Sequence, residues 1–574
     1  MKKILITIFL LNSIIDFAQK NLTPFEKSKG KETATYHECI TFYEQLASIN
    51  PEIKIKDFDS TAAGYPLQLV LYSSNKIFDP AVWRKQEKII ILINNGIHPG
   101  EPDGIDASMM LLRDAVEKKI TIPQNVVLAI IPVYNIGGCL NRNSYSRVNQ
   151  DGPVSYGFRG NEENLDLNRD FIKNDASETK PFEKIFQWLN PDIFIDNHVS
   201  DGADYPYTIT LLTTQHNKLS GEIGEYLHNI FEPLLYKSML QKGWPMCPYV
   251  NAEENPADGW NAFYDSPRYS GGYAALFQTM SFTVETHMLK PFADRVKSTY
   301  DFLQSIAEEA GAHAVEINAR RKNAMIASGK QQTFATGWKA DTSKYELIDF
   351  NGYEAAYKTS EVTGLQRLYY DRTKPYKKQV KFYNTFIPKT TIQKPFAYII
   401  PKGWRQVIDL LKLNGAVLSP LSNDTSMVLE YYHIENYKCL QQPYEKHHFN
   451  YDVQLSALRD TIHLQKGDYI IYTGQRSDRY IVETLEPMCD DSFFKWNFFD
   501  AILQQKEGYS DYRWEDVAAS YLQQHPELKQ QLEEKKKTDT AFAKSSEAQL
   551  AFVYHNSPYY EKAHLRYPVF RLIK

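Results

Sequence analysis

The sequence has few of the features that define several classes of protein. Its five cysteines in 574 residues are far apart and none forms a Cys-x-x-Cys pair, so they are poor metal ligands, although one or two disulfides stay open. Basic and acidic residues number 65 and 70, and this balance predicts no nucleic-acid partner. After residue 18 no apolar run approaches the roughly 18 residues of a membrane span, and we find no internal repeat. With 43% hydrophobic residues, the chain can form a core, and its length predicts two or more domains.

Residues 1–18 have the pattern of a cleavable export signal. Lys2 and Lys3 precede an apolar run over residues 4–15, and Ala18 supplies a small residue before the expected cut. The run is too short to span a bilayer comfortably. Asp16 is unusual so close to a cleavage site, and a buried N-terminal helix or strand is the alternative. We therefore expect a signal peptide over 1–18 and a secreted or periplasmic protein.

Buried strands and helices alternate between about residues 35 and 315. Apolar, β-branched runs predict strands at 88–94, 126–134, 192–196 and 281–286, and helical periodicity appears at 103–117 and 181–189. This pattern predicts the α/β class, with a mixed, mostly parallel sheet between helices. A long charged helix over about 291–328 is expected to close the unit, which we assign to residues 19–330.

The sequence pattern changes after about residue 331. Aromatic, Thr-rich patterns such as 382–400 and 468–473 predict strands, and a charged stretch over about 514–538 predicts a solvated helix. No catalytic constellation is evident there. We therefore expect residues 331–574 to form a β-rich accessory region with a helical C-terminal segment and no assigned role.

A His-x-x-Glu motif carries the first chemical signal. His98 and Glu101 follow a predicted buried strand and precede a predicted helix, so they lie at the strand's carboxyl end, where ligands bind in such sheets. His198 ends another predicted strand. Two histidines and one glutamate form the three-ligand set of a catalytic zinc site with an open position for water. The same spacing at His313 and Glu316 falls inside the charged helix, where a solvated helix face is expected.

Two further segments offer polar groups. The loop at 158–171 contains Arg159, Asn168 and Arg169, and guanidinium groups bind carboxylates or a developing oxyanion. The alternative is a surface ion pair. Glu285 interrupts an apolar strand near its carboxyl end, where it could take a proton from a zinc-bound water or pair with a basic neighbour. His287 shares its face, and we expect it to be structural.

Together these segments resemble the zinc metallocarboxypeptidase family. In that family a His-x-x-Glu is followed by an Arg, an Asn-Arg pair, a third zinc His and a catalytic Glu. The same order is filled here by His98, Glu101, Arg159, Asn168, Arg169, His198 and Glu285. The step of nine residues from Arg159 to Asn168, and the Asp-Leu-Asn-Arg string, look like the cytosolic branch of the family. The resemblance covers about residues 35 to 320 and implies a mixed eight-stranded sheet.

The resemblance implies a mechanism. One zinc ion on His98, Glu101 and His198 would polarise the scissile carbonyl, and Glu285 would act as general base toward its bound water. Arg159 would stabilise the oxyanion. The pair Asn168 and Arg169 would hold the free terminal carboxylate of a peptide substrate, so the enzyme would cut C-terminal peptide or cell-wall peptide bonds.

Some positions leave alternatives open. The family's mobile Tyr has three candidates, Tyr264, Tyr269 and Tyr273, of which we favour Tyr269 as substrate-binding. Arg268 could favour acidic side chains, although an exposed loop arginine is the expected role. Arg147 could replace Arg159.

Another Asn-Arg pair, at 141–142, lacks the acidic-Leu context of Asn168 and Arg169 and is discounted. Two other functions are alternatives. The first is a zinc amidohydrolase of the aspartoacylase type, which the longer Glu101-to-Asn168 separation disfavours. The second is a non-catalytic binding protein on the same fold, which the retained ligands and Glu285 disfavour.

Overall fold

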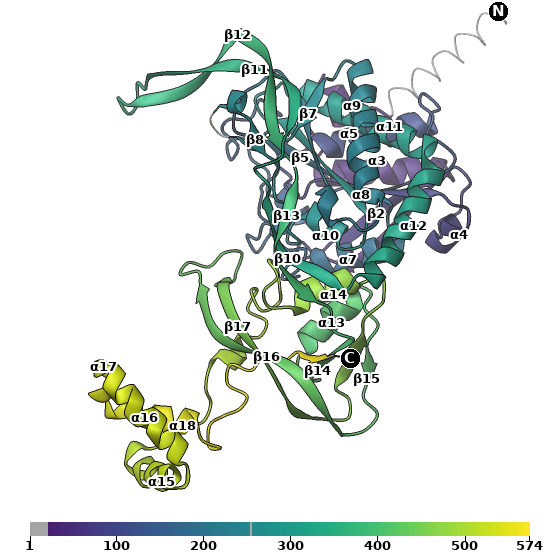
Figure 1. Cartoon of the computed structure of the whole chain (residues 1–574). Helices are drawn as coiled ribbons and strands as arrows, with labels where there is room; N and C mark the ends of the chain where they lie inside the picture. Colours follow the sequence, from purple (N-terminus) through teal and green to yellow (C-terminus); the bar gives the residue numbers. More distant parts are fainter. Residues whose placement is uncertain (1–20, 253–254, 574) are drawn as a thin grey trace, which may run out of the picture.

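The computed structural model describes residues 21–252 and 255–573. The expected signal at 1–18 lies outside the described residues. Figure 1 shows an α/β unit, coloured purple to teal, joined to a green β-rich region and a yellow helical lobe, after which the chain returns to the β-rich region and ends there. No helix in the described part of the chain is long and apolar enough to cross a membrane.

The core of the α/β unit is an eight-stranded sheet in the order β1-β2-β4-β3-β5-β9-β6-β7. The four central strands run parallel: β4 (Val126–Ile131), β3 (Ile89–Asn94), β5 (Ile193–Ser200) and β9 (Met280–His287). The outer strands are β1 (Ile53–Ser60), β2 (Pro66–Tyr72), β6 (Ile209–Thr213) and β7 (Met246–Pro248). Antiparallel pairing joins β1 to β2, β2 to β4 and β6 to β9, while β6 and β7 are parallel. The predicted mixed, mostly parallel sheet is confirmed.

Helices cover both faces of this sheet, which is why β4 is apolar throughout and β3 is apolar up to Asn94. Successive residues of β3 alternate between the faces: Ile91 joins one hydrophobic cluster and Leu92 the other. The first face packs on α3 (Tyr36–Ile49), α5 (Asp103–Val116), α9 (Glu232–Gln241) and α11 (Phe292–Ala312). The second packs on α7 (Thr179–Leu189) and α10 (Ser270–Ala275). Short helices and turns link these elements: α2 (Pro24–Lys27), α4 (Pro80–Lys85), α6 (Ile136–Leu140), η1 (Leu167–Arg169), η2 (His216–Lys218), α8 (Ile223–Tyr226), the π-helical η3 (Leu227–Phe231) and η4 (Pro256–Asp258).

Two predicted helices are each divided in the structure. The charged stretch at 291–328 forms α11 and α12 (Ala314–Lys330), with non-helical backbone at His313 between them. The stretch at 514–538 forms α15 (Asp511–Gln524) and α16 (Pro526–Thr538). There Pro526 lacks a backbone N–H and restricts the residue before it, so His525 leaves the helical region and the helix restarts.

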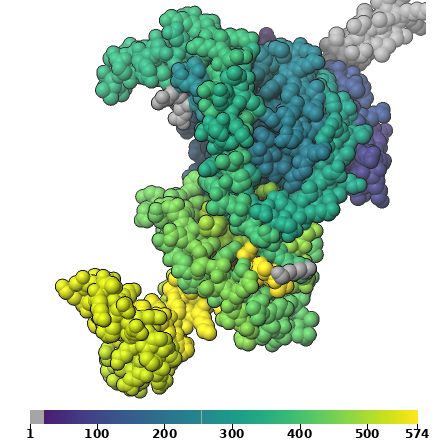
Figure 2. Space-filling model, viewed as in Figure 1, coloured from purple at the N-terminus to yellow at the C-terminus, as the bar shows by residue number. Residues whose placement is uncertain are grey.

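The accessory region contains a six-stranded sheet and a long hairpin. The sheet has the order β15-β18-β14-β19-β16-β17. Its strands are β14 (Ala397–Ile400), β15 (Ser419–Pro420), β16 (Thr425–Cys439), β17 (Asn450–Leu464), β18 (Tyr469–Tyr472) and β19 (Phe570–Leu572). The hairpin strands β11 (Glu346–Thr359) and β12 (Gln366–Tyr383) project from the molecule (Figure 2). A two-stranded sheet pairs β10 (Thr333–Ala340) with β13 (Phe386–Gln393).

The accessory region packs directly on the α/β unit. The cluster on the α7 face continues into α13 (Arg405–Leu413), α14 (Asp478–Leu485) and the six-stranded sheet. The strand β8 (Trp260–Asn261) of the α/β unit also pairs with β12. The helices α15, α16, α17 (Thr540–Ala543) and α18 (Ser546–His555) form a separate small core and make the projecting lobe, and η5 (Asp500–Leu503) precedes them. The α/β unit and the accessory region therefore share the hydrophobic cluster on the α7 face, whereas the C-terminal helices pack on a cluster of their own.

Candidate metal centre and active site

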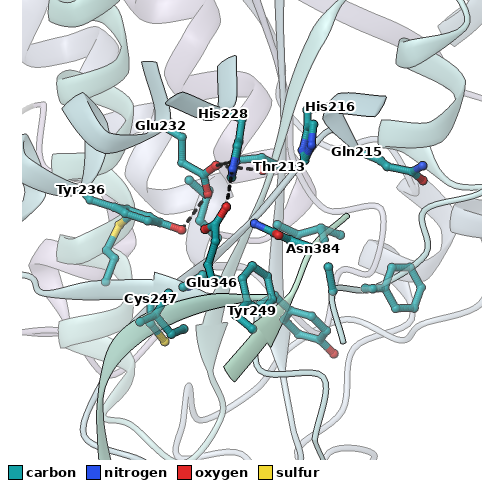
Figure 3. Close-up of a pocket in the computed structure, with 18 of the residues that line it drawn as sticks. Thr213, Gln215, His216, His228, Glu232, Tyr236, Cys247, Tyr249, Glu346 and Asn384 are labelled. Atoms are coloured by element: carbon teal, nitrogen blue, oxygen red, sulfur yellow. Dashed lines mark hydrogen bonds and ion pairs between the residues drawn. The ribbon is translucent and has the colours of Figure 1, made fainter. Parts of the chain in front are cut away.

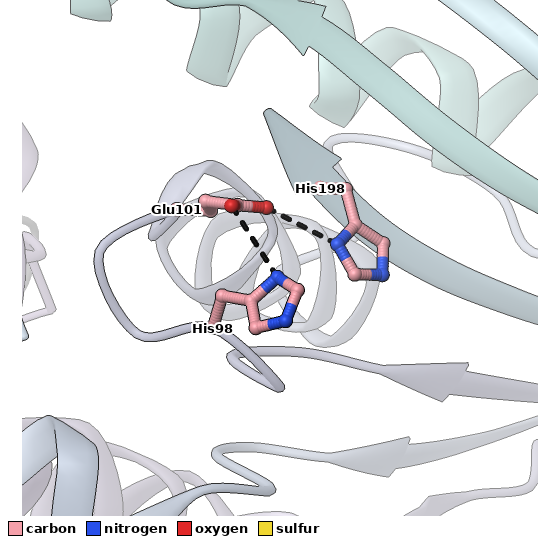
Figure 4. Close-up of side chains that lie close together, drawn as sticks. All are labelled: His98, Glu101 and His198. Carbon is pink, nitrogen blue, oxygen red and sulfur yellow. Dashed lines mark hydrogen bonds and ion pairs between the residues drawn. The ribbon is translucent and has the colours of Figure 1, made fainter. Parts of the chain in front are cut away.

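Three side chains from two strand ends converge on one point. His98 and Glu101 lie in the turn between β3 and α5, and His198 lies in β5, the strand next to β3. One ligand atom from each lies within 4.8 Å of the others, and each residue is at most 4% exposed. Figure 4 shows both imidazole rings facing the Glu101 carboxylate. Within residues 21–252 and 255–573 no other group of His, Cys, Asp or Glu meets the same criterion.

The turn itself depends on glycine. Gly96 has φ +65°, and a Cβ there would lie 3.1 Å from Ile105 Cδ1. At Gly100, between the two ligands, a Cβ would lie only 2.7 Å from the Arg147 side chain. The absence of side chains at these two positions lets the turn close tightly over β3 and lets Arg147 reach Glu101.

The hydrogen bonds of the histidines prepare them for a metal ion. His98 Nε2 lies 2.9 Å from an Asp166 carboxylate oxygen, and His198 Nε2 lies 2.9 Å from an Asp196 oxygen. Each ring therefore keeps its Nδ1 on the side of Glu101, and the buried Nδ1 of His98 has no hydrogen-bond partner among the described residues. The Nδ1 atoms of His98 and His198 lie 3.3 and 3.1 Å from the Glu101 oxygens. Two histidines that are each bound to a carboxylate through Nε2 and turn Nδ1 toward one glutamate form a donor set that fits one metal ion.

Glu101 is fixed from three sides. One carboxylate oxygen accepts a hydrogen bond from the backbone N–H of Val199 at 2.9 Å, and the other accepts a hydrogen bond from Arg147 Nη1 at 2.9 Å. Burial would raise the pKa of Glu101, but Arg147 and the two histidines outweigh it and hold the pKa well below its usual range. The carboxylate is therefore negatively charged, as a metal ligand must be.

Glu285 lies in β9, directly opposite His198 of β5. Its side chain lines a cavity of about 500 Å³ together with all three ligands. Burial raises the pKa of Glu285 to about 8; His198 opposes this shift, and the Glu101 carboxylate reinforces it. A carboxylate with a raised pKa beside a metal-ligand group can accept and release a proton near neutral pH.

Both candidate arginines line this cavity. Arg159 is the more exposed, at 45%; its guanidinium binds Asp166 at 2.8 Å and lies 3.6 Å from Glu101. Arg147 is 14% exposed and is held by Glu101 and by Gln150, at 2.6 Å. Arg159 therefore has the freer guanidinium, and Arg147 supports the ligand Glu101. The discounted Arg142 does not line this cavity and binds Ser155.

Asn168, Arg169 and Tyr269 form another part of the cavity wall. The Arg169 guanidinium stacks on the Tyr269 ring, 4.5 Å from its centroid, and the Asn168 side chain accepts the backbone N–H of Ser270 at 3.1 Å. These contacts join the turn η1 to the start of α10. The arrangement presents a guanidinium, an amide and a phenol to the cavity.

The other tyrosine candidates point elsewhere. Tyr264 donates to Asp490 at 2.6 Å, and the fully buried Tyr273 donates to Asn414 at 2.7 Å; neither lines the cavity. The expectation of an exposed Arg268 was wrong, because its side chain is only 17% exposed and binds Asp491 at 2.7 Å. Packing against the accessory region, which cannot be seen from a loop sequence, buries this arginine.

Three carboxylates of the site were not predicted from the sequence. Asp166 and Asp196 orient the two histidines, and Asp265, 5% exposed, lies in the cavity wall. Asp196 had a signal, because it lies two residues before His198 on the same strand face. Asp166 also had a signal, because it is the first residue of the Asp-Leu-Asn-Arg string. His287 is fully buried and binds the Ala203 carbonyl at 2.9 Å, in keeping with a structural role.

All five cysteines are free, so none of the disulfides left open from the sequence forms. Cys439 is partly buried and the other four are buried. Cys39, Cys139, Cys247 and Cys489 fill core positions, where burial raises the pKa of each thiol. They contribute nothing to the candidate site.

A second cavity, of about 320 Å³, lies between β6 and the accessory strands β11 and β12 (Figure 3). In it His228 binds Glu346 of β11 at 2.6 Å and lies 3.8 Å from Glu232. Hydrogen bonds to both carboxylates raise the pKa of His228 to about 10, while burial and the stacked His228 ring lower the pKa of His216 to about 4. This paired cluster fastens the base of the hairpin to the α/β unit.

The comparisons with known proteins agree with the motifs. No family model matches the sequence. The chain is 21% identical to Carboxypeptidase 2 of Trichophyton rubrum over 75% of this chain and 77% of the relative, and 21% identical to that of Trichophyton tonsurans over 83% and 86%. These relatives are named carboxypeptidases, the enzyme class that the ordered motifs predict.

Solved structures of carboxypeptidases also match part of the chain. The metallo-carboxypeptidase of Burkholderia cenocepacia matches at 15% identity and a TM-score of 0.36, over 49% of this chain and 70% of that chain. Carboxypeptidase A of Helicoverpa armigera matches at 15% identity and a TM-score of 0.37, over 49% and 74%.

Proposed function

We propose that this chain is a zinc-dependent carboxypeptidase, exported by the signal at 1–18, that removes residues from the C-terminal end of peptides or cell-wall peptides. The observation that carries the proposal is the convergence of His98, Glu101 and His198 in one cavity with Glu285. The name carboxypeptidase of the curated relatives supports the same reaction class.

The metal-binding part of the proposal rests on the donor set. His98 and His198 would bind zinc through Nδ1, and Glu101 through its carboxylate, because the Nε2 atoms are taken by Asp166 and Asp196. Bound zinc would supply a Lewis acid that polarises the scissile carbonyl and lowers the pKa of water.

Proton transfer is assigned to Glu285. Its carboxylate accepts a proton from the attacking water as the new C–O bond forms, and it returns that proton to the amine as the C–N bond breaks. Arg159, with its freer guanidinium, stabilises the negative charge that develops on the carbonyl oxygen. Arg147 orients Glu101.

Recognition of the chain end is assigned to Asn168, Arg169 and Tyr269. A guanidinium binds a carboxylate through two parallel hydrogen bonds, and the amide of Asn168 offers a further donor. Stacking on Tyr269 holds the Arg169 guanidinium in place. A free terminal carboxylate would therefore be the feature that selects the bond to be cut.

The test uses the full chain without residues 1–18, loaded with zinc. N-acylated peptides with free C-termini, including peptidoglycan stem peptides, are incubated and analysed by mass spectrometry beside the same peptides amidated at the C-terminus. We expect stepwise loss of C-terminal residues from the free peptides only. Removal of the N-acyl group instead would indicate a deacylase, and binding without cleavage would indicate a binding protein; either result would overturn the proposal.

A further inference from the structure

A turn of the accessory region has an unusual backbone conformation. Tyr444 and His447 exchange backbone hydrogen bonds of 2.8 and 3.0 Å around the two residues Glu445 and Lys446. Both central residues have positive φ, +47° and +76°. This is the geometry of a two-residue hairpin turn that normally takes Asn-Gly, because residues with a Cβ adopt it at a cost. Such strain persists where the surrounding structure holds it, often beside a functional site.

The strained turn touches the loop that carries the recognition residues. The Glu445 carboxylate accepts the backbone N–H of Asp166 at 2.9 Å. His447 Nε2 lies 2.7 Å from the Asp175 carboxylate at the other end of the same loop, and Asp175 also binds Lys173 at 2.9 Å. Glu445 thus acts on the residue that orients His98.

One network therefore runs from the accessory region to two groups of the active site. The Asp166 side chain contacts His98 Nε2 at 2.9 Å and the Arg159 guanidinium at 2.8 Å. It also caps η1 by accepting the backbone N–H of Asn168 at 2.9 Å. A displacement of Asp166 would move all three groups, so the hydrogen bond from its backbone to Glu445 is well placed to set their positions.

A second contact from the accessory region holds the tyrosine loop. Asp491 accepts both the backbone N–H and the side chain of Arg268, at 3.0 and 2.7 Å. The Arg268 guanidinium also stacks against Phe449 and Trp496, 4.7 and 4.9 Å from their ring centroids. Arg268 directly precedes Tyr269, whose ring supports the Arg169 guanidinium.

The two loops also meet each other. The Arg268 carbonyl accepts the backbone N–H of Phe171 at 3.4 Å. Tyr264, at the start of the tyrosine loop, donates to Asp490 at 2.6 Å. The accessory region is thus in contact with both segments that would recognise a substrate carboxylate.

We propose that the accessory region is a scaffold for the active site, in which Glu445 and Asp491 are positioning residues that touch no substrate. Glu445 acts through Asp166 on His98 and Arg159, and Asp491 acts through Arg268 on Tyr269 and Arg169. The effect on catalysis rests on the proposed carboxypeptidase function, whereas the effect on the Asp166 backbone does not.

The test compares Glu445→Ala, Glu445→Gln and Asp491→Asn with the unmodified chain. In Glu445→Ala we expect amide hydrogen exchange in the segment around Asp166 to rise at least tenfold. Zinc should be lost to a chelator about ten times faster, because the carboxylate that orients His98 would be held less firmly. With peptides, kcat should fall and KM should change little. Glu445→Gln retains an acceptor oxygen and should restore most of each value.

Asp491→Asn should give the opposite kinetic pattern, with KM raised about tenfold and kcat and zinc retention little changed. Lys446→Gly is the matched control for the turn, because it relieves a positive φ without touching Asp166, and it should leave exchange and kinetics unchanged. If Glu445 and Asp491 only stabilised the fold, their substitutions would lower the Tm and the amount of folded protein. They would not lower kcat selectively in one variant and raise KM selectively in the other.

The proposal is overturned if Glu445→Ala leaves exchange at Asp166 unchanged, or if both variants change kcat and KM alike. If the unmodified chain cleaves no peptide, the proposed function fails. The exchange and zinc-release measurements, which need no substrate, still decide whether Glu445 positions Asp166.

Discussion

Glu285 and His198 occupy opposite positions on the neighbouring parallel strands β9 and β5. Paired residues of adjacent strands point to the same side of a sheet, so the candidate general base and the third candidate metal ligand face the same cavity. This register places the Glu285 carboxylate, whose pKa is raised, beside the candidate metal ligands.

The first prediction concerns Glu285. Glu285→Gln should retain one metal ion per chain but lower kcat by at least ~10²-fold, because the amide cannot accept the proton of the attacking water. Metal content and initial rates on N-acylated peptides measure the two effects. Glu316→Gln, at the solvated His-x-x-Glu of α12, is the control and should leave both unchanged. A fully active Glu285→Gln variant would show that the base is another residue.

The second prediction separates the two His-x-x-Glu motifs. His98→Ala removes a candidate ligand whose buried Nδ1 faces Glu101 at 3.3 Å, so metal binding should fall from one ion per chain to almost none. His313 has the same His-x-x-Glu spacing, but its imidazole lies 3.6 Å from Glu309, so His313→Ala should bind metal normally. Atomic spectroscopy after dialysis measures the content. Equal metal loss in both variants would contradict the assigned site.

The third prediction concerns Asp166. Asp166→Asn keeps the shape of the side chain but removes the charge that holds His98 and Arg159. Metal affinity should weaken ~10–100-fold, as for other carboxylates that orient metal-bound histidines. Competition with a chromogenic chelator measures the change. Unchanged affinity would indicate that His98 is oriented by other contacts.

The fourth prediction concerns recognition of the chain end. Arg169→Ala should raise KM ~10²-fold for peptides with a free carboxylate, because a charge-assisted, paired contact is lost. For C-terminally amidated peptides, which are already poor substrates, the same substitution should have little effect. Arg367→Ala, on the exposed hairpin, is the control. A similar loss for both kinds of peptide would place the recognition of the carboxylate elsewhere.

The fifth prediction concerns stability and pH. Burial, partly offset by hydrogen bonds from Thr33 and Ala34, raises the pKa of Asp106 to about 7. The folded state therefore binds the proton more tightly than the unfolded state, so this contribution to stability is full below about pH 4 and falls as the pH rises to about 7. At 1.36 kcal/mol per pKa unit, the loss is about 4 kcal/mol.

Asp106→Asn keeps the shape without titrating. It should remove the decline in the free energy of unfolding between about pH 4 and pH 7 that Asp106 causes. Urea denaturation at several pH values measures the difference between the variant and the unmodified chain. Parallel curves would contradict the assignment.

Much of the fold could be predicted from local pattern. The run at 88–94 is apolar and β-branched, and β3 occupies Ile89–Asn94. The helix expected at 103–117 begins at Asp103, as α5 does. The divided helices are the exception, since a charged, periodic stretch does not show where a single residue such as His313 leaves the helical region.

The site was only partly visible in the sequence. His98, Glu101, His198 and Glu285 stand out because each is a polar residue near or just beyond the end of an apolar strand, where burial without a function is costly. The sequence does not show whether Arg159 or Arg147 is the candidate oxyanion-binding residue, because both lie in polar loops. Only the structure distinguishes them, through the contact of Arg159 with Asp166 and of Arg147 with Glu101.

The sequence by itself determined the alternation of strands and helices and the chemical identity of the candidate metal ligands, because these depend on residues within a few positions of one another. The tertiary structure decided which groups meet. His98 and His198 are brought together by the pairing of β3 with β5, and Glu445 reaches Asp166 across 279 residues of chain. Contacts over such separations depend on the packing of whole elements, and no local pattern records them.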